Sequence, residues 1–163
     1  MEEINVQQSR APKWIFVLNL AIQNRLLTRS RLHAWGIAEE VNCPLCNEAE
    51  ETIDHLLFKC RIAGGIWSKL LQWQGITRTP MEWKREIQWA EGKATGNNAH
   101  AQVYRLTLAC AVYYIWNERN RRVFQEQQKI VEVIVRQIAQ EVAIRGSKNS
   151  KTEKRIAEID YYL

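Results

Sequence analysis

Three cysteines and one histidine lie within one short segment of the chain. Two residues separate Cys43 from Cys46, eight separate Cys46 from His55, and four separate His55 from Cys60. Thiolate and imidazole are donors that zinc prefers, and two closely spaced cysteines can reach one ion from a tight turn. Four such donors complete a tetrahedron and leave no position open for water. The motif therefore predicts one structural zinc ion, held by Cys43, Cys46, His55 and Cys60.

Other interpretations of these residues remain open. The cysteines could be unrelated core residues or a redox pair, although no thioredoxin-like strand–helix pattern surrounds them. Iron is an alternative to zinc, but a histidine ligand in a solitary site favours zinc. The fourth cysteine, Cys110, lies within an apolar run and is expected in the core.

The start of the chain, Met1-Glu2-Glu3, is acidic and does not resemble a secretory signal. We therefore expect an intracellular, reducing compartment, either the nucleus or an organelle, where paired cysteines bind metals more often than they form disulfides. The longest apolar run, Leu106–Trp116, is far shorter than the roughly 20 residues that a membrane span needs. A membrane is not an expected partner.

The apolar pattern predicts a mainly α-helical protein. A helix is expected over Trp14–Leu32, and Thr52 or Asp54 could cap a short helix that reaches Phe58. Gly64-Gly65 should break or bend the chain before a helix over Ile66–Trp73. Residues 1–73 are thus predicted to form a zinc-binding helical domain.

The second half of the chain also has helical periodicity. Residues 74–99 are expected to be a connecting loop region with one short helix and a flexible segment at about 91–99. Residues 100–146 should form a helical hairpin or long helices: Val103–Trp116 is apolar nearly all round, and Val123–Val142 is strongly amphipathic. Residues 147–163 are predicted to be a basic and aromatic tail.

The residues around the cysteines resemble the zinc-binding domain that follows the reverse transcriptase in plant LINE-type (non-LTR) retrotransposons. The resemblance rests on Asn24–Leu32, Trp35-Gly36-Ile37, Cys43–Cys46, Glu51–Cys60, Ile66-Trp67 and, further along, Ile115–Phe124. It implies that the zinc ligands of that family correspond to Cys43, Cys46, His55 and Cys60. It also implies a domain that helps to hold template RNA or target DNA.

The chain contains no pair of aspartates of the polymerase type, no endonuclease or RNase H carboxylate set and no phosphate-binding glycine loop. We therefore expect no enzymatic activity. Whether the chain is a fragment or a free-standing descendant of a retrotransposon protein stays open at this stage.

Two clusters of arginine are candidate nucleic-acid contacts. Arg25, Arg29 and Arg31 are expected on one helix, and Arg119, Arg121 and Arg122 follow a Trp-rich helix. Arginine suits both phosphate binding and stacking on bases, and we expect RNA slightly ahead of DNA. Each cluster could equally be the solvated face of its helix, with Glu118 and Glu126 as pairing partners.

The zinc loop itself should repel phosphate, because it carries Glu39, Glu40, Glu48, Glu50, Glu51 and Asp54.

The alternative function is a structural or protein-interaction subunit of a larger ribonucleoprotein or polymerase complex. The apolar stripe of Val123–Val142 could exceed what the chain itself covers. Trp73, Trp83 and Trp89 could be interface anchors, and the aromatic end at residues 159–163 could dock on a partner.

Overall fold

The computed structural model describes residues 12–159, and this part of the chain is almost entirely helical, as predicted. An isolated bridge between Asn42 and Glu50 is its only extended pairing, and it contains no β-strand. No helix in this range is long and apolar enough to cross a membrane. The elements are α1 (Pro12–Ile22), α2 (Arg29–Ala34), η1 (His55–Lys59), α3 (Arg61–Trp73), α4 (Trp83–Lys93), α5 (Ala99–Phe124), α6 (Val131–Gly146) and α7 (Ser150–Ile159).

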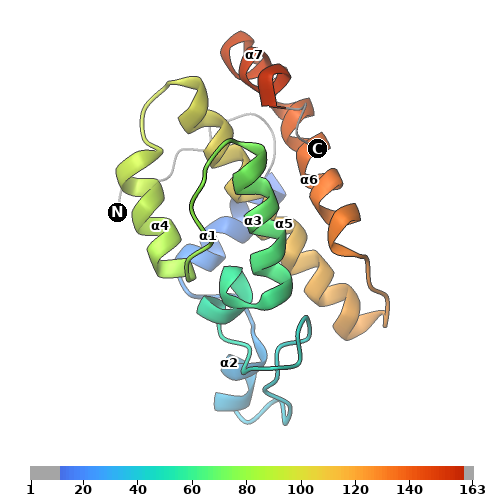
Figure 1. The fold of residues 1–163 in the computed structure, drawn as a ribbon. Helices are drawn as coiled ribbons and strands as arrows, with labels where there is room; N and C mark the ends of the chain where they lie inside the picture. Colours follow the sequence, from blue (N-terminus) through green and yellow to red (C-terminus); the bar gives the residue numbers. More distant parts are fainter. Residues whose placement is uncertain (1–11, 160–163) are drawn as a thin grey trace.

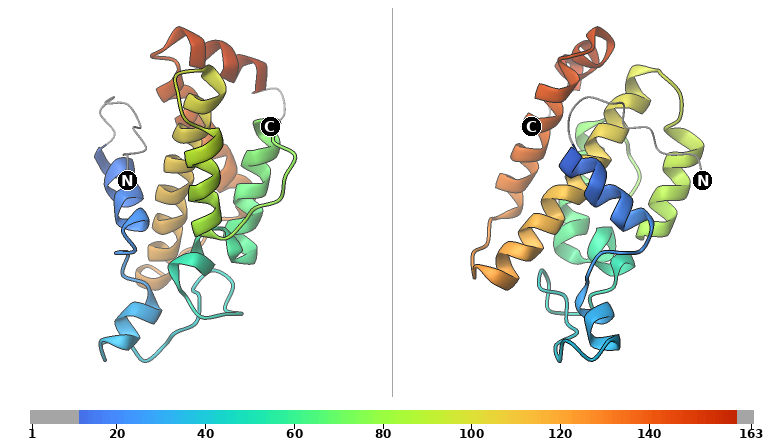
Figure 2. Two further views of the ribbon diagram at one scale, coloured as in Figure 1. Left: turned by 90° about the vertical axis from the view of Figure 1, so that its left-hand side faces the viewer. Right: turned by 180° about the vertical axis from the view of Figure 1, so that it is seen from behind.

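Helix α5 is the centre of the fold. It begins at the N-cap Asn98, whose side chain accepts a hydrogen bond from the N–H of Ala101 at 2.9 Å. Its middle is buried on all sides, as predicted from the apolar run, and Cys110 lies in the core. Helices α1, α3, α6 and α7 all contact it (Figure 1). The loop between α2 and α3 lies at the opposite end of the molecule from α7 (Figure 2).

The single helix predicted over Trp14–Leu32 is wrong, because the chain turns at residues 23–28. Asn24 adopts a left-handed conformation with φ 56°, which asparagine tolerates better than most residues. Thr28 then caps α2 by accepting a hydrogen bond from the N–H of Arg31. Arg25 lies in the turn and Arg29 at the start of α2, so the two do not share a helical face.

The helix predicted over Val123–Val142 is correct only from Val131 onward. Helix α5 continues to Phe124, the chain reverses over residues 125–130, and α6 runs back along α5 as the second arm of a hairpin (Figures 1 and 2). The carboxylate of Glu118 fixes the turn by accepting a hydrogen bond from the N–H of Lys129 at 2.7 Å. Glu118 therefore binds the backbone of the turn.

Two further segments are more ordered than the sequence predicted. Helix α3 passes straight through Gly64-Gly65, and residues 150–159 form α7, which buries Ile156 and Ile159. A Cβ on Gly64 would lie 2.6 Å from the carbonyl oxygen of Phe58, so this glycine permits a close approach of backbone. Gly64 therefore allows α3 to pack tightly against η1, and the helix continues through it without a break.

The expected interface anchors are largely internal. Trp73 and Trp83 are buried, so the prediction that they anchor a partner is wrong, and Trp89 is half-buried. The indole N–H of Trp83 donates to the carbonyl of Ala21 at 3.2 Å and ties α4 to the end of α1. Residues 160–163, which hold most of the aromatic tail, lie outside the described range.

Candidate metal centre

The first two cysteines lie in a tight loop between α2 and η1. The loop is closed by two backbone hydrogen bonds, from Cys43 N to Ala49 O and from Glu51 N to Val41 O, both 2.7 Å long. Within it, Asn47 has φ 57° and its N–H bonds back to the carbonyl of Cys43. The N–H of Glu48 points at the sulfur of Cys46 at 3.4 Å. This turn presents both sulfur atoms to one point.

The other two candidate ligands come from η1 and the residue that follows it. The hydroxyl of Thr52 accepts a hydrogen bond from the N–H of His55 at 3.1 Å, as expected for a capping residue. The chain then kinks at Phe58, which has φ 86°. Because of this kink, Cys60 turns back toward His55 and becomes the N-cap of α3.

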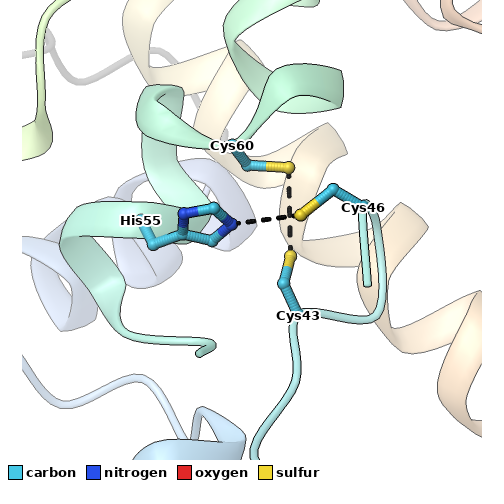
Figure 3. Close-up of side chains that lie close together, drawn as sticks. All are labelled: Cys43, Cys46, His55 and Cys60. Carbon is cyan, nitrogen blue, oxygen red and sulfur yellow. Dashed lines mark hydrogen bonds between the residues drawn. The ribbon is translucent and has the colours of Figure 1, made fainter. Parts of the chain in front are cut away.

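The ligand atoms of Cys43, Cys46, His55 and Cys60 all lie within 4.8 Å of one another (Figure 3). A tetrahedral zinc ion with Zn–S bonds of about 2.3 Å and Zn–N bonds of about 2.0 Å would separate two sulfurs by about 3.8 Å and a sulfur from a nitrogen by about 3.5 Å. The structure has 3.9 Å between the sulfurs of Cys43 and Cys60, and 3.3 Å between Cys46 Sγ and His55 Nε2. The residues therefore fit a tetrahedral metal ion. All three cysteines are free, and 3.9 Å is far longer than the roughly 2.0 Å of a disulfide bond.

Burial and hydrogen bonding shape the protonation of these donors. The Cys43 thiol donates to Cys60, and this contact raises the pKa of Cys43 and lowers the pKa of Cys60. The backbone N–H groups of Ala63 and Ile62 at the start of α3 further favour the Cys60 thiolate. Burial lowers the pKa of His55, which favours the neutral imidazole that a metal ligand requires.

A buried ion pair joins the metal loop to the helical body. The guanidinium of Arg119 on α5 donates two hydrogen bonds to the carboxylate of Glu51, at 2.7 and 2.8 Å. Glu51 is fully buried, Arg119 is 3% exposed, and the same carboxylate accepts from the N–H of Arg29 at 2.7 Å. This pair is not predictable from the sequence, because no local pattern links two residues that are 68 positions apart.

Other predicted nucleic-acid contacts also serve the loop. Arg122 donates to the carbonyl of Leu45 at 2.9 Å, and Arg29 donates to the carbonyl of Asn42 at 2.9 Å and pairs with Glu40. Burial removes Arg119 from the candidate phosphate contacts, because the residue is 3% exposed and its guanidinium already donates to Glu51, Asn120 and the carbonyl of Leu27. The proposed pairing of Arg119 and Arg122 with Glu118 and Glu126 is likewise not formed.

Three of the six arginines form no hydrogen bond or ion pair with the metal loop within the described part of the chain, and each is exposed or half-buried. Arg25 is exposed and Arg121 half-buried, and neither forms a side-chain hydrogen bond or ion pair with residues 12–159. Arg31 donates to the carbonyl of Asn24 and stacks over Trp35, 5.0 Å from its ring centre. His33 and His100 are exposed.

Residues 3–67 match the family described as zinc-binding in reverse transcriptase. The matched segment contains all four candidate ligands and ends within α3, so it covers less than half of the chain. No curated protein and no solved structure matches the chain.

Proposed function

We propose that this chain, whose residues 3–67 match the family described as zinc-binding in reverse transcriptase, is a non-catalytic module that binds nucleic acid, with RNA favoured over DNA. The observation that carries the proposal is the Cys₃His cluster inside the matched segment. A reverse transcriptase handles an RNA template, so a domain of this family is expected to work close to nucleic acid.

In this proposal the metal is zinc, and Cys43, Cys46, His55 and Cys60 hold it. Four protein donors fill the coordination shell, so no site is left for a water or substrate, and the ion is structural. It would tie the Cys43–Cys46 turn to the start of α3. Glu51 and Arg119 would hold the same loop against α5, so the ion and the ion pair stabilise one unit.

The exposed arginines support nucleic-acid binding. Arg25 and Arg121 are the members of the predicted set with no partner among residues 12–159, so their charges are available to phosphate. Trp35 is 55% exposed and carries the Arg31 guanidinium over its ring. An exposed aromatic ring beside arginine is a surface on which unpaired bases stack, which favours a single strand.

The proposal is tested by measuring the affinity for a fluorescent single-stranded RNA at several salt concentrations. Binding through phosphates should weaken linearly with the logarithm of salt concentration. The double variant Arg25→Ala/Arg121→Ala should lower the magnitude of that slope by about 1.4, because each lost phosphate contact contributes about 0.7 on a single strand. The matched control is Arg85→Ala/Arg136→Ala, which removes two exposed charges elsewhere and should leave the slope nearly unchanged. No detectable binding at low salt would refute the proposal.

A second candidate function is a protein-interaction subunit of a larger complex. Phe124, Ile130 and Ile144 are each more than 60% exposed, and Val133 is 38% exposed. These side chains lie at the end of α5, in the turn and on α6, and exposed apolar side chains that gather into one patch mark a protein-interaction surface. If nucleic acid fails to bind at any salt concentration, this function becomes the better explanation of the fold.

A further inference from the structure

A polar groove lies beside the candidate metal centre, between the metal loop and the turn that joins α5 to α6. Its volume is about 390 Å³, within the range of small-molecule sites in proteins. One wall comes from α2 and the metal loop, and the other from the end of α5 and the turn. It is lined by Arg29, Glu40, Pro44, Asn47, Arg122, Glu126, Gln127 and Gln128.

The walls of this groove are fixed by contacts already described. Arg122 crosses from α5 to the metal loop and donates to the carbonyl of Leu45 at 2.9 Å. Its Nε is buried and has no hydrogen-bond partner among the described residues, so the guanidinium retains an unused donor. Arg29, at the start of α2, donates to the carbonyl of Asn42 in the same loop. The groove therefore depends on the loop staying closed.

The charges in the groove argue against a phosphate as its occupant. Two arginines are balanced by two glutamates, and Arg29 already pairs with Glu40 at 3.1 Å. A phosphate would meet the Glu126 carboxylate without a surplus of positive charge to offset the repulsion. A neutral ligand avoids this cost.

Apart from Pro44, the remaining lining residues carry side-chain amides. The side chains of Asn47, Gln127 and Gln128 are exposed and make no hydrogen bond to residues 12–159. Each amide has donors and an acceptor side by side, which is the pattern of a nucleobase edge. Asparagine and glutamine pair with adenine, arginine with guanine and glutamate with cytosine in known complexes.

We propose that this groove binds one unpaired base of a single strand by its hydrogen-bonding edge. The inference rests on the proposed function, and it adds a base-reading site to the phosphate contacts of Arg25 and Arg121. Asn47, Gln127 and Gln128 contact the base edge, and Arg122 forms the floor. The backbone of the strand stays outside the groove, where the two glutamates do not face it.

The test compares a base-containing strand with an abasic strand of the same length and charge. The wild-type protein should bind the base-containing strand about tenfold more tightly, because the discrimination expected from one good pair of hydrogen bonds to a base edge includes this fold-change. RNA and DNA homopolymers form separate arms, which identify the preferred sugar and base.

The test variant is Asn47→Gly/Gln127→Ala/Gln128→Ala. Glycine keeps the left-handed backbone that position 47 requires, so the variant removes the three amides without straining the metal loop. It should lose about tenfold of the preference for bases and keep its affinity for the abasic strand. The matched control is Gln72→Ala/Gln140→Ala, two exposed glutamines on α3 and α6 outside the groove, which should behave as wild type. Metal content and circular dichroism check that each variant is folded.

A second readout does not depend on any variant. In wild-type protein, the side-chain amide signals of Gln127 and Gln128 should shift in NMR spectra when the base-containing strand is added, and stay in place with the abasic strand. If the amides do not shift, or if the triple variant keeps its preference for bases, the groove inference is overturned while salt-dependent binding leaves the proposed function standing. If the wild type binds neither strand, both proposals fail.

Discussion

The Glu51–Arg119 ion pair offers a sharp perturbation of the link between the metal loop and α5. Removing one partner of a buried pair leaves the other charge without compensation, at a cost of about 3–5 kcal/mol. Arg119→Met would leave the Glu51 carboxylate with only the N–H of Arg29 as a close donor. Glu51→Gln would leave the Arg119 guanidinium beside a neutral amide.

The assay is urea unfolding of the metal-loaded protein. For a slope of about 2 kcal/mol/M, a loss of 3–5 kcal/mol moves the midpoint down by about 1.5–2.5 M. The double variant Glu51→Gln/Arg119→Met should cost little more than either single change, because both charges are gone, which gives a coupling energy near 3 kcal/mol.

The matched control is the exposed pair of Glu48 and Arg61, whose side chains are 61% and 64% exposed. Their charged atoms, Glu48 Oε1 and Arg61 Nη2, are 3.3 Å apart. Truncating either partner there should change the free energy of unfolding by less than about 1 kcal/mol. If Arg119→Met has an equally small effect, or if the two single changes at the buried pair add without coupling, the pair does not hold the loop and the reasoning is refuted.

Three further predictions concern the metal loop and its contact with α3. Gly64→Ala should lower the free energy of unfolding in urea by about 1–3 kcal/mol, because the added Cβ would lie 2.6 Å from the Phe58 carbonyl oxygen. Gly65→Ala is the control: its Cβ would meet open space, so it should not destabilise the protein. Equal effects of the two changes would contradict this explanation. Chelation of the metal should speed hydrogen exchange of residues 41–60 far more than that of α5, and uniform protection would argue against a metal-held loop. Because burial lowers the pKa of His55 from 6.5, the unfolded chain binds the proton first, so the melting temperature should fall as the pH drops below about 6.5. Metal content should fall at a lower pH, where the imidazole of the folded chain takes up a proton, and metal retained through acid titration would oppose the assignment.

The cluster of metal donors was predictable because its signal is local. The spacing of Cys43, Cys46, His55 and Cys60 is short enough that turn geometry alone brings most of the donors together, and the apolar run of α5 marks a buried helix without knowledge of its neighbours. The helix breaks near Asn24 and at residues 125–130 were missed, because the apolar spacing continues across both turns. There, tertiary contacts such as Glu118 with the N–H of Lys129 override the local pattern.

The roles of the arginines could not be predicted from the sequence. Arg119 and Arg121 are two positions apart in the same basic cluster, yet the first is buried against Glu51 and the second is half-exposed. Their difference depends on which face of α5 meets a loop formed 68 residues earlier. The sequence shows that the arginines lie close together, but only the tertiary packing determines which of them are buried and which are open to solvent.

The most direct test of the central claim is X-ray absorption spectroscopy with elemental analysis of the protein purified under reducing conditions. We expect one zinc ion per chain, with three sulfur donors at about 2.3 Å and one nitrogen donor at about 2.0 Å. Metal-free folded protein, a disulfide between Cys43 and Cys46, or a zinc shell that includes water would contradict this expectation.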